Sequence, residues 1–296
     1  MIKLFDAHCH LQDPRIFDSA PEIIRAALLC RVLYMAVNGI TENDWDKVKQ
    51  MGEQYPSVIP NYGLHPWKSQ FPLKQIDNKC TRYVVGRSSN WLESLRKYIE
   101  DTPAAAIGEI GLDRSPLAKG IDYQQQLEVF KPQLELAKEI GRPVSVHCLD
   151  AFDDLIPIMQ DIGPFPAGVI LHSYSGSAEI VPKLAELGAY FSFSGHNMND
   201  DKEKEKQVLK LVPLHRILLE TDSPDGLPNN MSHACCASKT SSMSTNQTYN
   251  QPSNVHIVLN YIASLLEMPK EELAQISYRN SIQLFSYPGS KVCKEH

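Results

Sequence analysis

The sequence lacks several features that would each indicate a particular class of protein. No apolar run approaches the roughly 20 residues of a transmembrane helix, so we expect a soluble chain with no membrane span. A formal net charge of −6 argues against a broad basic surface for duplex DNA, and any polyanion would have to be gripped locally. The seven cysteines are scattered and lack CxxC spacing, which argues against a structural zinc knuckle and fits a reducing compartment. The first residues carry no secretory signal pattern, so we expect a cytoplasmic protein, with the nucleus as an alternative.

The order of apolar and amphipathic stretches predicts the fold. A chain of 296 residues suits a single α/β barrel, which typically needs about 250 residues. Short apolar runs alternate with longer amphipathic stretches such as 123–140, the pattern of repeated βα units. Eight such runs are present, beginning at residues 3, 32, 58, 105, 142, 167, 189 and 216. We therefore predict an α/β fold, a single-domain TIM (β/α)8 barrel.

Two polar stretches interrupt this rhythm, at about 68–90 and 228–252. Both are long and polar for ordinary connections, so we expect insertions that are locally mobile or lie over the catalytic end of the barrel. Neither marks a second domain. The barrel is expected over 1–285, and 286–296 is expected to be a frayed C-terminal tail.

Polar side chains end most of the apolar runs. The carboxyl ends of parallel barrel strands meet at one mouth, where the active site lies. Because buried imidazoles and carboxylates need partners, core packing explains these residues poorly. The residues at the run ends are His8, His10, His65, Glu109, Asp113, His147, His172, Glu220 and Asp222.

The stretch "FDAHCH" places two histidines on one face of a strand. Side chains two residues apart share a face, so His8 and His10 can be ligands of one ion. Asp6 has the same parity and could orient an imidazole. Cys9 and Cys148 each adjoin a histidine on the opposite face, and we expect both to be buried, inert thiols.

The number of candidate ligands indicates the type of site. Four histidines and two carboxylates exceed what one tetrahedral ion with an open position can use. Two ions about 3.5–4 Å apart, bridged by a carboxylate and a water, would use them all. The sequence therefore predicts a binuclear hydrolytic site with two divalent cations, such as zinc, magnesium or manganese.

Five motifs, in this order, resemble the TatD family of metal-dependent deoxyribonucleases, part of the amidohydrolase superfamily. They are "FDAHCH", "GLHP", "GEIGLD", "HSYSGS" and "LLETDSP", and the likeness runs from about residue 4 to about residue 285. The resemblance implies a TIM barrel, a divalent-metal site and hydrolysis of DNA phosphodiesters by a 3′→5′ exodeoxyribonuclease. Carried over position by position, it implies His65 beside the substrate phosphate and, as metal ligands, His8, His10, Glu109 as the bridging carboxylate, His147, His172 and Asp222.

Two positions depart from the family pattern. Members usually carry an arginine two residues after the histidine of the fifth run, where this chain has Leu149. Gln251 stands where members have a carboxylate before the last barrel helix. Both differences bear on substrate affinity and specificity more than on metal binding.

Within this hypothesis we assign roles and weigh simpler ones. Asp222 is expected to accept the proton of the nucleophilic water, beside Glu109. His65 and Arg114 are candidates to stabilise charge on the phosphate, although Arg114 is as easily a solvated loop charge. Asp113 is more simply a helix cap than a catalytic group. Glu220 is expected to be a structural partner bonded to a neighbouring strand, and His196, His215, His233 and His256 are expected to be ordinary surface or core residues.

Two other functions remain open. The same barrel and ligands could hydrolyse an amide, a lactone or a small phosphate ester, since one fold and metal site supports many chemistries. A non-catalytic partner-binding protein with a structural metal is the third hypothesis, and the intact ligand set argues against it. The sequence leaves the oligomeric state open.

Overall fold

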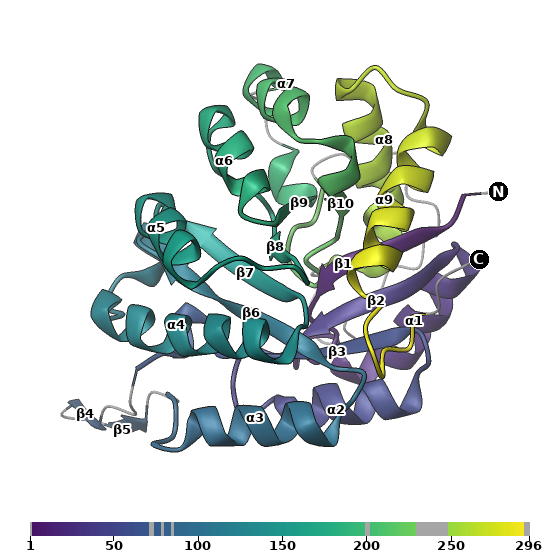
Figure 1. The fold of residues 1–296 in the computed structure, drawn as a ribbon. Helices are drawn as coiled ribbons and strands as arrows, with labels where there is room; N and C mark the ends of the chain where they lie inside the picture. Colours follow the sequence, from purple (N-terminus) through teal and green to yellow (C-terminus); the bar gives the residue numbers. More distant parts are fainter. Residues whose placement is uncertain are drawn as a thin grey trace.

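The computed structural model describes residues 2–70, 74–77, 80–83, 86–198, 202–228 and 248–292. Neighbouring strands of its main sheet pair in parallel, and the sheet curls into a barrel with helices on the outside (Figure 1). The predicted TIM barrel is confirmed. The eight strands, in sheet order, are β1 (Leu4–Cys9), β2 (Val32–Asn38), β3 (Val58–Tyr62), β6 (Ala106–Asp113), β7 (Val144–Leu149), β8 (Val169–Leu171), β9 (Ala189–Phe193) and β10 (Ile217–Leu219).

The two end strands of this sheet, β1 and β10, are joined by hydrogen bonds just beyond β10. The backbone N–H of Asp222 donates to the carbonyl of His8 at 2.9 Å, and that of His10 donates to Ser223 at 2.7 Å. The Asp6 carboxylate accepts from the backbone N–H of Thr221 at 2.8 Å and from its hydroxyl at 2.6 Å. Asp6 therefore fastens the closure of the barrel, and the expectation that it orients an imidazole is wrong.

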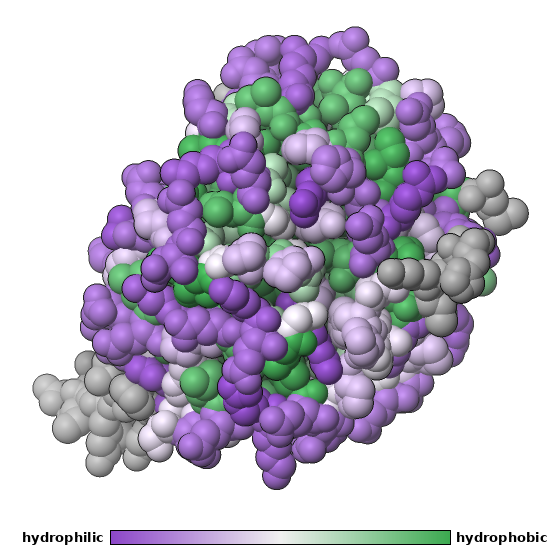
Figure 2. Space-filling view, viewed as in Figure 1, coloured by the Kyte–Doolittle hydropathy of each residue, from purple (hydrophilic) through white to green (hydrophobic). Residues whose placement is uncertain are grey.

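The helices pack around the barrel. The predicted helix over 123–140 is α4: the Asp122 carboxylate caps its first turn by accepting from Gln124, and Gly141 ends it in a left-handed conformation. Hydrophilic residues lie around the rim of the face in Figure 2, with hydrophobic ones in separate patches between them. The helices are α1 (Ala20–Leu29), α2 (Trp45–Gln54), α3 (Trp91–Asp101), α4 (Tyr123–Ile140), α5 (Phe152–Ile162), α6 (Val181–Glu186), α7 (Lys202–Leu211), α8 (Val255–Leu265) and α9 (Lys270–Leu284).

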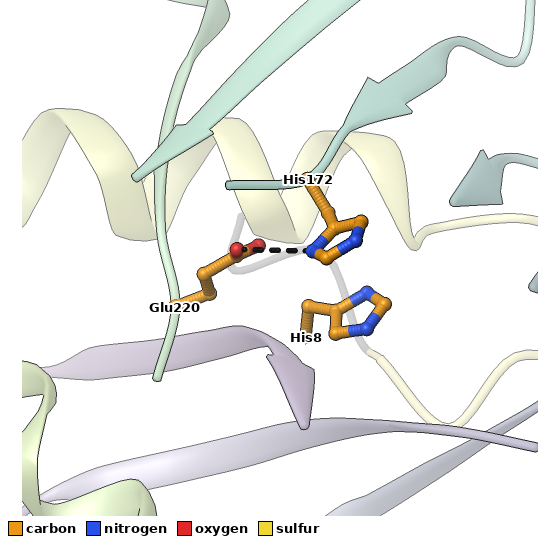
Figure 3. A group of neighbouring side chains, drawn as sticks. All are labelled: His8, His172 and Glu220. Carbon is orange, nitrogen blue, oxygen red and sulfur yellow. Dashed lines mark ion pairs between the residues drawn. The ribbon is translucent and has the colours of Figure 1, made fainter. Parts of the chain in front are cut away.

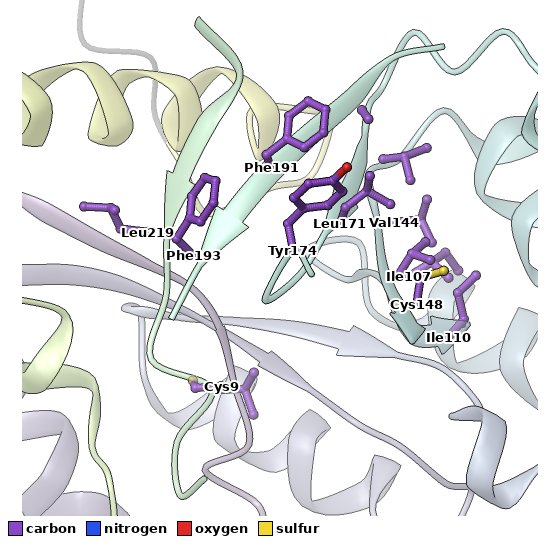
Figure 4. Packing of buried hydrophobic residues seen from close by; sticks show 14 of the residues in the cluster. Cys9, Ile107, Ile110, Val144, Cys148, Leu171, Tyr174, Phe191, Phe193 and Leu219 are labelled. Atoms are coloured by element: carbon purple, nitrogen blue, oxygen red, sulfur yellow. The ribbon is translucent and has the colours of Figure 1, made fainter. Parts of the chain in front are cut away.

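Two apolar clusters hold these layers together. The larger one lies between strands and helices, and Figure 4 shows part of it, including Cys9 and Cys148. Both thiols are buried and free, as predicted, and burial raises the pKa of the Cys9 thiol well above its usual range. The smaller cluster joins residues from strands all around the barrel to α9, where Phe5 stacks on Phe285 with ring centroids 5.0 Å apart. The helix α9 therefore plugs the end of the barrel where the strands begin.

The first of the two predicted insertions contains a strand pair of its own. β4 (Lys74–Asp77) and β5 (Cys80–Tyr83) pair antiparallel, and Figure 1 shows them standing away from the barrel. Most of the second insertion lies outside the described residues, but its end, Asn250 and Gln251, is buried.

The end of the described chain is packed rather than frayed. The ammonium of Lys291 donates to the carbonyls of Tyr55 at 3.1 Å and Val58 at 2.9 Å, and Val292 is buried. The last four residues of the expected tail lie outside the described part. None of the helices in that part is long and apolar enough to cross a membrane.

Candidate metal centre

The six predicted ligands and His65 meet at the carboxyl ends of the strands. His8, Glu109 and His147 belong to β1, β6 and β7, and the others follow the strand that precedes them. All but His10 are buried, and His10 is partly so. With the exception of His8, these residues line one cavity of about 980 Å³. These side chains thus lie together at the mouth of the barrel, whereas Asp113 and Glu220, which also end apolar runs, do not line the cavity.

Glu109 lies between two groups of imidazoles, one at each carboxylate oxygen. Its Oε2 atom is 3.2 Å from Nε2 of His10 and 3.5 Å from Nε2 of His8. Its Oε1 atom is 2.9 Å from Nε2 of His172 and 3.2 Å from Nδ1 of His147. A carboxylate with its two oxygens in two nitrogen-rich groups is the geometry expected of a bridging ligand.

Asp222 completes the group on the Oε2 side. Its Oδ1 atom lies 3.4 Å from Nε2 of His10 and 3.7 Å from Nε2 of His8. Its backbone has φ 55°, a left-handed conformation that is uncommon for a residue other than glycine. The closing hydrogen bonds of the barrel and the Asn250 amide, which donates to the carbonyls of Thr221 and Gly226, hold this turn in place.

The groups behind the imidazoles decide which ring nitrogen faces the site. Nδ1 of His10 lies 2.8 Å from the carbonyl oxygen of Asn38, which can only accept, so Nδ1 carries the proton and Nε2 presents a lone pair. Nε2 of His147 lies 3.1 Å from a carboxylate oxygen of Asp113, so Nδ1 presents the lone pair there.

His172 is arranged in the same way. Its Nδ1 atom lies 3.5 Å from Oε1 of Glu220 (Figure 3), and its Nε2 faces Oε1 of Glu109. The ring of His172 stacks on that of His8 with centroids 4.1 Å apart. Glu220 also accepts from the backbone N–H and the hydroxyl of Ser173, at 2.7 and 2.8 Å. Glu220 is therefore a buried structural partner, the kind of role the sequence predicted for it.

These lone pairs point at carboxylate oxygens, and that arrangement requires positive charge between them. Burial lowers the pKa of His10, but the carboxylates of Asp222 and Glu109 outweigh it and raise that pKa well above its usual value. Burial raises the pKa of Glu109, but the surrounding histidines outweigh it and hold that pKa well below its usual value. Imidazole nitrogens and carboxylate oxygens are ligands suited to zinc and related divalent ions. The donor set fits divalent cations.

His65 plays a different part from the other histidines. Its Nδ1 accepts from the backbone N–H of Trp67 at 3.2 Å, so Nε2 carries the proton of the neutral ring and donates to Oε1 of Glu109 at 3.2 Å. Burial lowers the pKa of His65 to about 4 and keeps the ring neutral. Distance alone groups His65 with Glu109 and His147 as possible ligands. The tautomer instead makes it a hydrogen-bond donor aimed into the cavity.

Two predictions about neighbouring residues need correction. Asp113 does not cap a helix, because its Oδ2 accepts from the indole N–H of Trp67 at 2.7 Å and faces His147, while Ser115 caps the short helix that follows. Arg114 is not among the residues that line the cavity: its guanidinium pairs with Asp154 at 2.7 Å and stacks on the ring of Tyr123. The structure does not bring Arg114 to the proposed phosphate site.

Sequence reasoning missed His196 and Trp67, which both line the cavity. Nε2 of His196 lies 3.0 Å from Oδ2 of Asp222. His196 ends the seventh apolar run, and that position was a usable signal. Trp67 follows the histidine of "GLHP" by two residues, and no local pattern indicates its role.

Close backbone contacts at β6 position Glu109 and its neighbours. Gly111 has φ +153°, and a Cβ atom there would lie 1.9 Å from the carbonyl oxygen of His147. A Cβ atom at Gly63 would lie 2.7 Å from the carbonyl oxygen of Glu109. Glycine at both positions lets strands that carry site residues approach more closely than a side chain would allow.

Comparison with known proteins agrees with this geometry. Residues 5–286 match the family model described as TatD related DNase. The chain is 31% identical over 282 residues to an uncharacterized metal-dependent hydrolase of Bacillus subtilis, YabD, covering 95% of this chain and 98% of that protein. It is 27% identical to human "Deoxyribonuclease TATDN3", covering 96% and 95% of the two chains. The crystal structure of YjjV, a TatD homolog from Escherichia coli, superimposes with a TM-score of 0.78 at 25% identity, covering 96% and 98%.

Proposed function

The chain belongs to the family of TatD related DNases and is a metal-dependent hydrolase of that family, and from this premise we propose that it hydrolyses phosphodiester bonds of DNA with two divalent cations. The observation that carries the proposal is the position of Glu109 between two groups of imidazoles. His8, His10 and Asp222 would hold one cation, His147 and His172 the other, and Glu109 would bridge them. Bound there, the cations would polarise a phosphoryl oxygen and lower the pKa of the nucleophilic water.

The protein's own groups would carry the proton and orient the phosphate. Asp222 has its Oδ1 atom inside the site and its Oδ2 atom fixed by His196, so it is held to accept the proton of the attacking water. The Nε2–H of His65, which donates to Oε1 of Glu109 here, would turn to a phosphoryl oxygen once a cation takes that carboxylate oxygen, while Trp67 keeps the tautomer fixed from the other side of the ring. Lys47 and Lys68 line the same cavity and would contact neighbouring phosphates, which fits a locally gripped substrate.

Attack at a chain end is favoured by the depth of the site. Glu109, His147 and His172 are each at most 9% exposed, so the scissile phosphate must enter the cavity. A free strand end can enter a recess that a continuous duplex cannot, and this supports an exonuclease. The 3′→5′ direction follows the resemblance to the family described above.

One experiment tests this function against the alternatives. The purified protein is assayed for metal content and then incubated with end-labelled single-stranded and duplex DNA in Mg²⁺, Mn²⁺ or Zn²⁺. We expect nucleotide release that requires metal and stops with EDTA. If DNA is not cleaved but small esters or amides are hydrolysed, the small-molecule hydrolase is favoured. The absence of stoichiometric metal would exclude both enzymatic functions.

A further inference from the structure

The cavity contains an exposed apolar surface that the proposed chemistry does not use. Among the described residues, two of the large hydrophobic side chains that remain exposed, Trp67 and Leu117, line this cavity. Trp67 is 39% exposed and Leu117 is 69% exposed. The loops that carry them are linked, since the Gln70 amide donates to the carbonyl of Gly120 at 2.8 Å. An exposed aromatic ring inside a cavity is a common way to bind a flat ligand.

The indole of Trp67 is held firmly although it is not buried. Its N–H donates at 2.7 Å to Oδ2 of Asp113, the same oxygen that faces Nε2 of His147 at 3.1 Å. The ring meets that of His65 nearly edge-on, with centroids 4.9 Å apart, and its centroid is 6.0 Å from that of His147. Two interactions therefore fix the ring beside the metal centre and leave part of it open to the cavity.

The surroundings of Trp67 indicate what occupies this surface. His65, the proposed hydrogen-bond donor to a phosphoryl oxygen, lies against the ring of Trp67. Lys68, a cation, follows Trp67 in the sequence and also lines the cavity. The nucleobase is the part of a nucleic acid that offers a flat aromatic face close to a phosphate. A base in a single strand can turn its face to such a ring, whereas a base inside a duplex has both faces covered by its neighbours.

We propose that Trp67 is a stacking platform for the nucleobase next to the scissile phosphate, so that the affinity for a strand end depends on the presence of that base. The inference rests on the proposed function, because the position of that phosphate is taken from it. Stacking of a base on an aromatic ring does not depend on which base is present, so the platform would not select a sequence.

Kinetics with an abasic substrate test the platform. The substrate is a single-stranded oligodeoxynucleotide, with or without an abasic residue at its 3′ end. For the wild-type enzyme, we expect removal of the base to raise KM by between about fivefold and a hundredfold. Trp67→Ala should raise KM for the intact substrate by a similar factor and be insensitive to the abasic change. Leu29→Ala, which removes an exposed side chain remote from the cavity, should behave like wild type.

Fluorescence provides a readout that is independent of turnover. The other two tryptophans, Trp45 and Trp91, are buried, so quenching by a phosphorothioate oligothymidylate should come from Trp67 and be absent in Trp67→Phe. Trp67→Phe keeps a ring but loses the bond to Asp113, so its KM should lie between those of wild type and Trp67→Ala. Intact hydrolysis with equal abasic sensitivity in wild type and Trp67→Ala would overturn the platform. An enzyme inert to DNA whose Trp67 is still quenched would overturn the proposed function and leave the platform standing.

Discussion

Nε2 of His147 lies 3.1 Å from Oδ2 of Asp113, and this contact places a carboxylate directly behind a proposed metal ligand. His172 also has a carboxylate behind it, that of Glu220, at a longer ion-pair distance of 3.5 Å. A carboxylate behind an imidazole fixes the ring and increases its basicity as a ligand. Both histidines on the Oε1 side of Glu109 face a carboxylate, and the contact of His147 is the shorter one.

The two histidines on the other side have neutral supports. Nδ1 of His8 lies 2.8 Å from the hydroxyl oxygen of Ser145, and Nδ1 of His10 lies 2.8 Å from the carbonyl oxygen of Asn38. This side has a carboxylate among its proposed ligands, Asp222, in place of a carboxylate support. The two proposed cation positions therefore differ in where their negative charge lies.

Asp113→Asn tests the support of His147. The amide is nearly isosteric but neutral, so we expect the affinity for one of the two cations to fall by about 10- to 100-fold. Isothermal titration of metal into the metal-free protein measures it. The matched control is Asp161→Asn on the exposed side of α5. If Asp113→Asn left the affinities for both cations unchanged, Asp113 would act only by holding Trp67 in place.

Glu109→Gln tests the bridge. An amide offers one carbonyl oxygen and one N–H₂ group, so it cannot serve both groups of imidazoles. We expect less than two equivalents of bound metal by mass spectrometry and a loss of turnover on the order of a thousandfold. Glu139→Gln, at an exposed ion pair with Arg96, serves as the control. Two tightly bound equivalents in Glu109→Gln would contradict a bridging role.

Asp222→Ala tests the proposed proton acceptor. We expect hydrolysis to fall by about 10²- to 10⁴-fold, the range of general base catalysis, with further loss if metal is lost. The fold should persist, since backbone bonds rather than this side chain close the barrel. Circular dichroism and turnover on single-stranded DNA measure the two effects. Turnover near that of wild type would remove Asp222 from the mechanism.

Gly111→Ala tests the close packing of β6 on β7. A methyl group there would lie 1.9 Å from a backbone oxygen of His147, so we expect a loss of about 4 kcal/mol or more in the free energy of unfolding. Gly120→Ala is the control, because it also has positive φ but nothing lies within 4 Å of the added atom. It should lose only about 1–2 kcal/mol. Denaturant unfolding measures the loss of stability in both variants. Equal losses would mean that the positive φ, and not the contact with His147, determines the cost of the substitution.

Leu149→Arg tests the departure from the family pattern. Leu149 lines the cavity, so an arginine there can reach a phosphate. We expect a lower KM for single-stranded DNA. The slope of log affinity against log salt concentration should become more negative by about 0.7. Leu29→Arg adds the same charge at an exposed site outside the cavity lining. An equal gain in both variants would mean that net charge, and not position 149, limits binding.

The sequence by itself determined the architecture and brought most of the site residues together. Alternating apolar runs specify βα units, and the parallel-strand rule then brings His8, Glu109, His147 and Asp222 to one mouth, as the structure shows. Both inferences use only periodicity along the chain and the order of the runs. The family motifs are likewise read from short stretches of the chain, and the match of residues 5–286 to the model of TatD related DNases agrees with them.

Only the tertiary structure decided which atom faces which. Asp113 supports His147 across 34 positions, and Arg114, its neighbour in sequence, turns away to Asp154. Likewise His196 reaches Asp222 from a different strand end. These contacts depend on the stagger of adjacent strands and on the paths of their loops, which place residues distant in sequence within hydrogen-bonding range. No local pattern encodes those distances, so the support of each ligand and the exposed face of Trp67 could be found only in the folded chain.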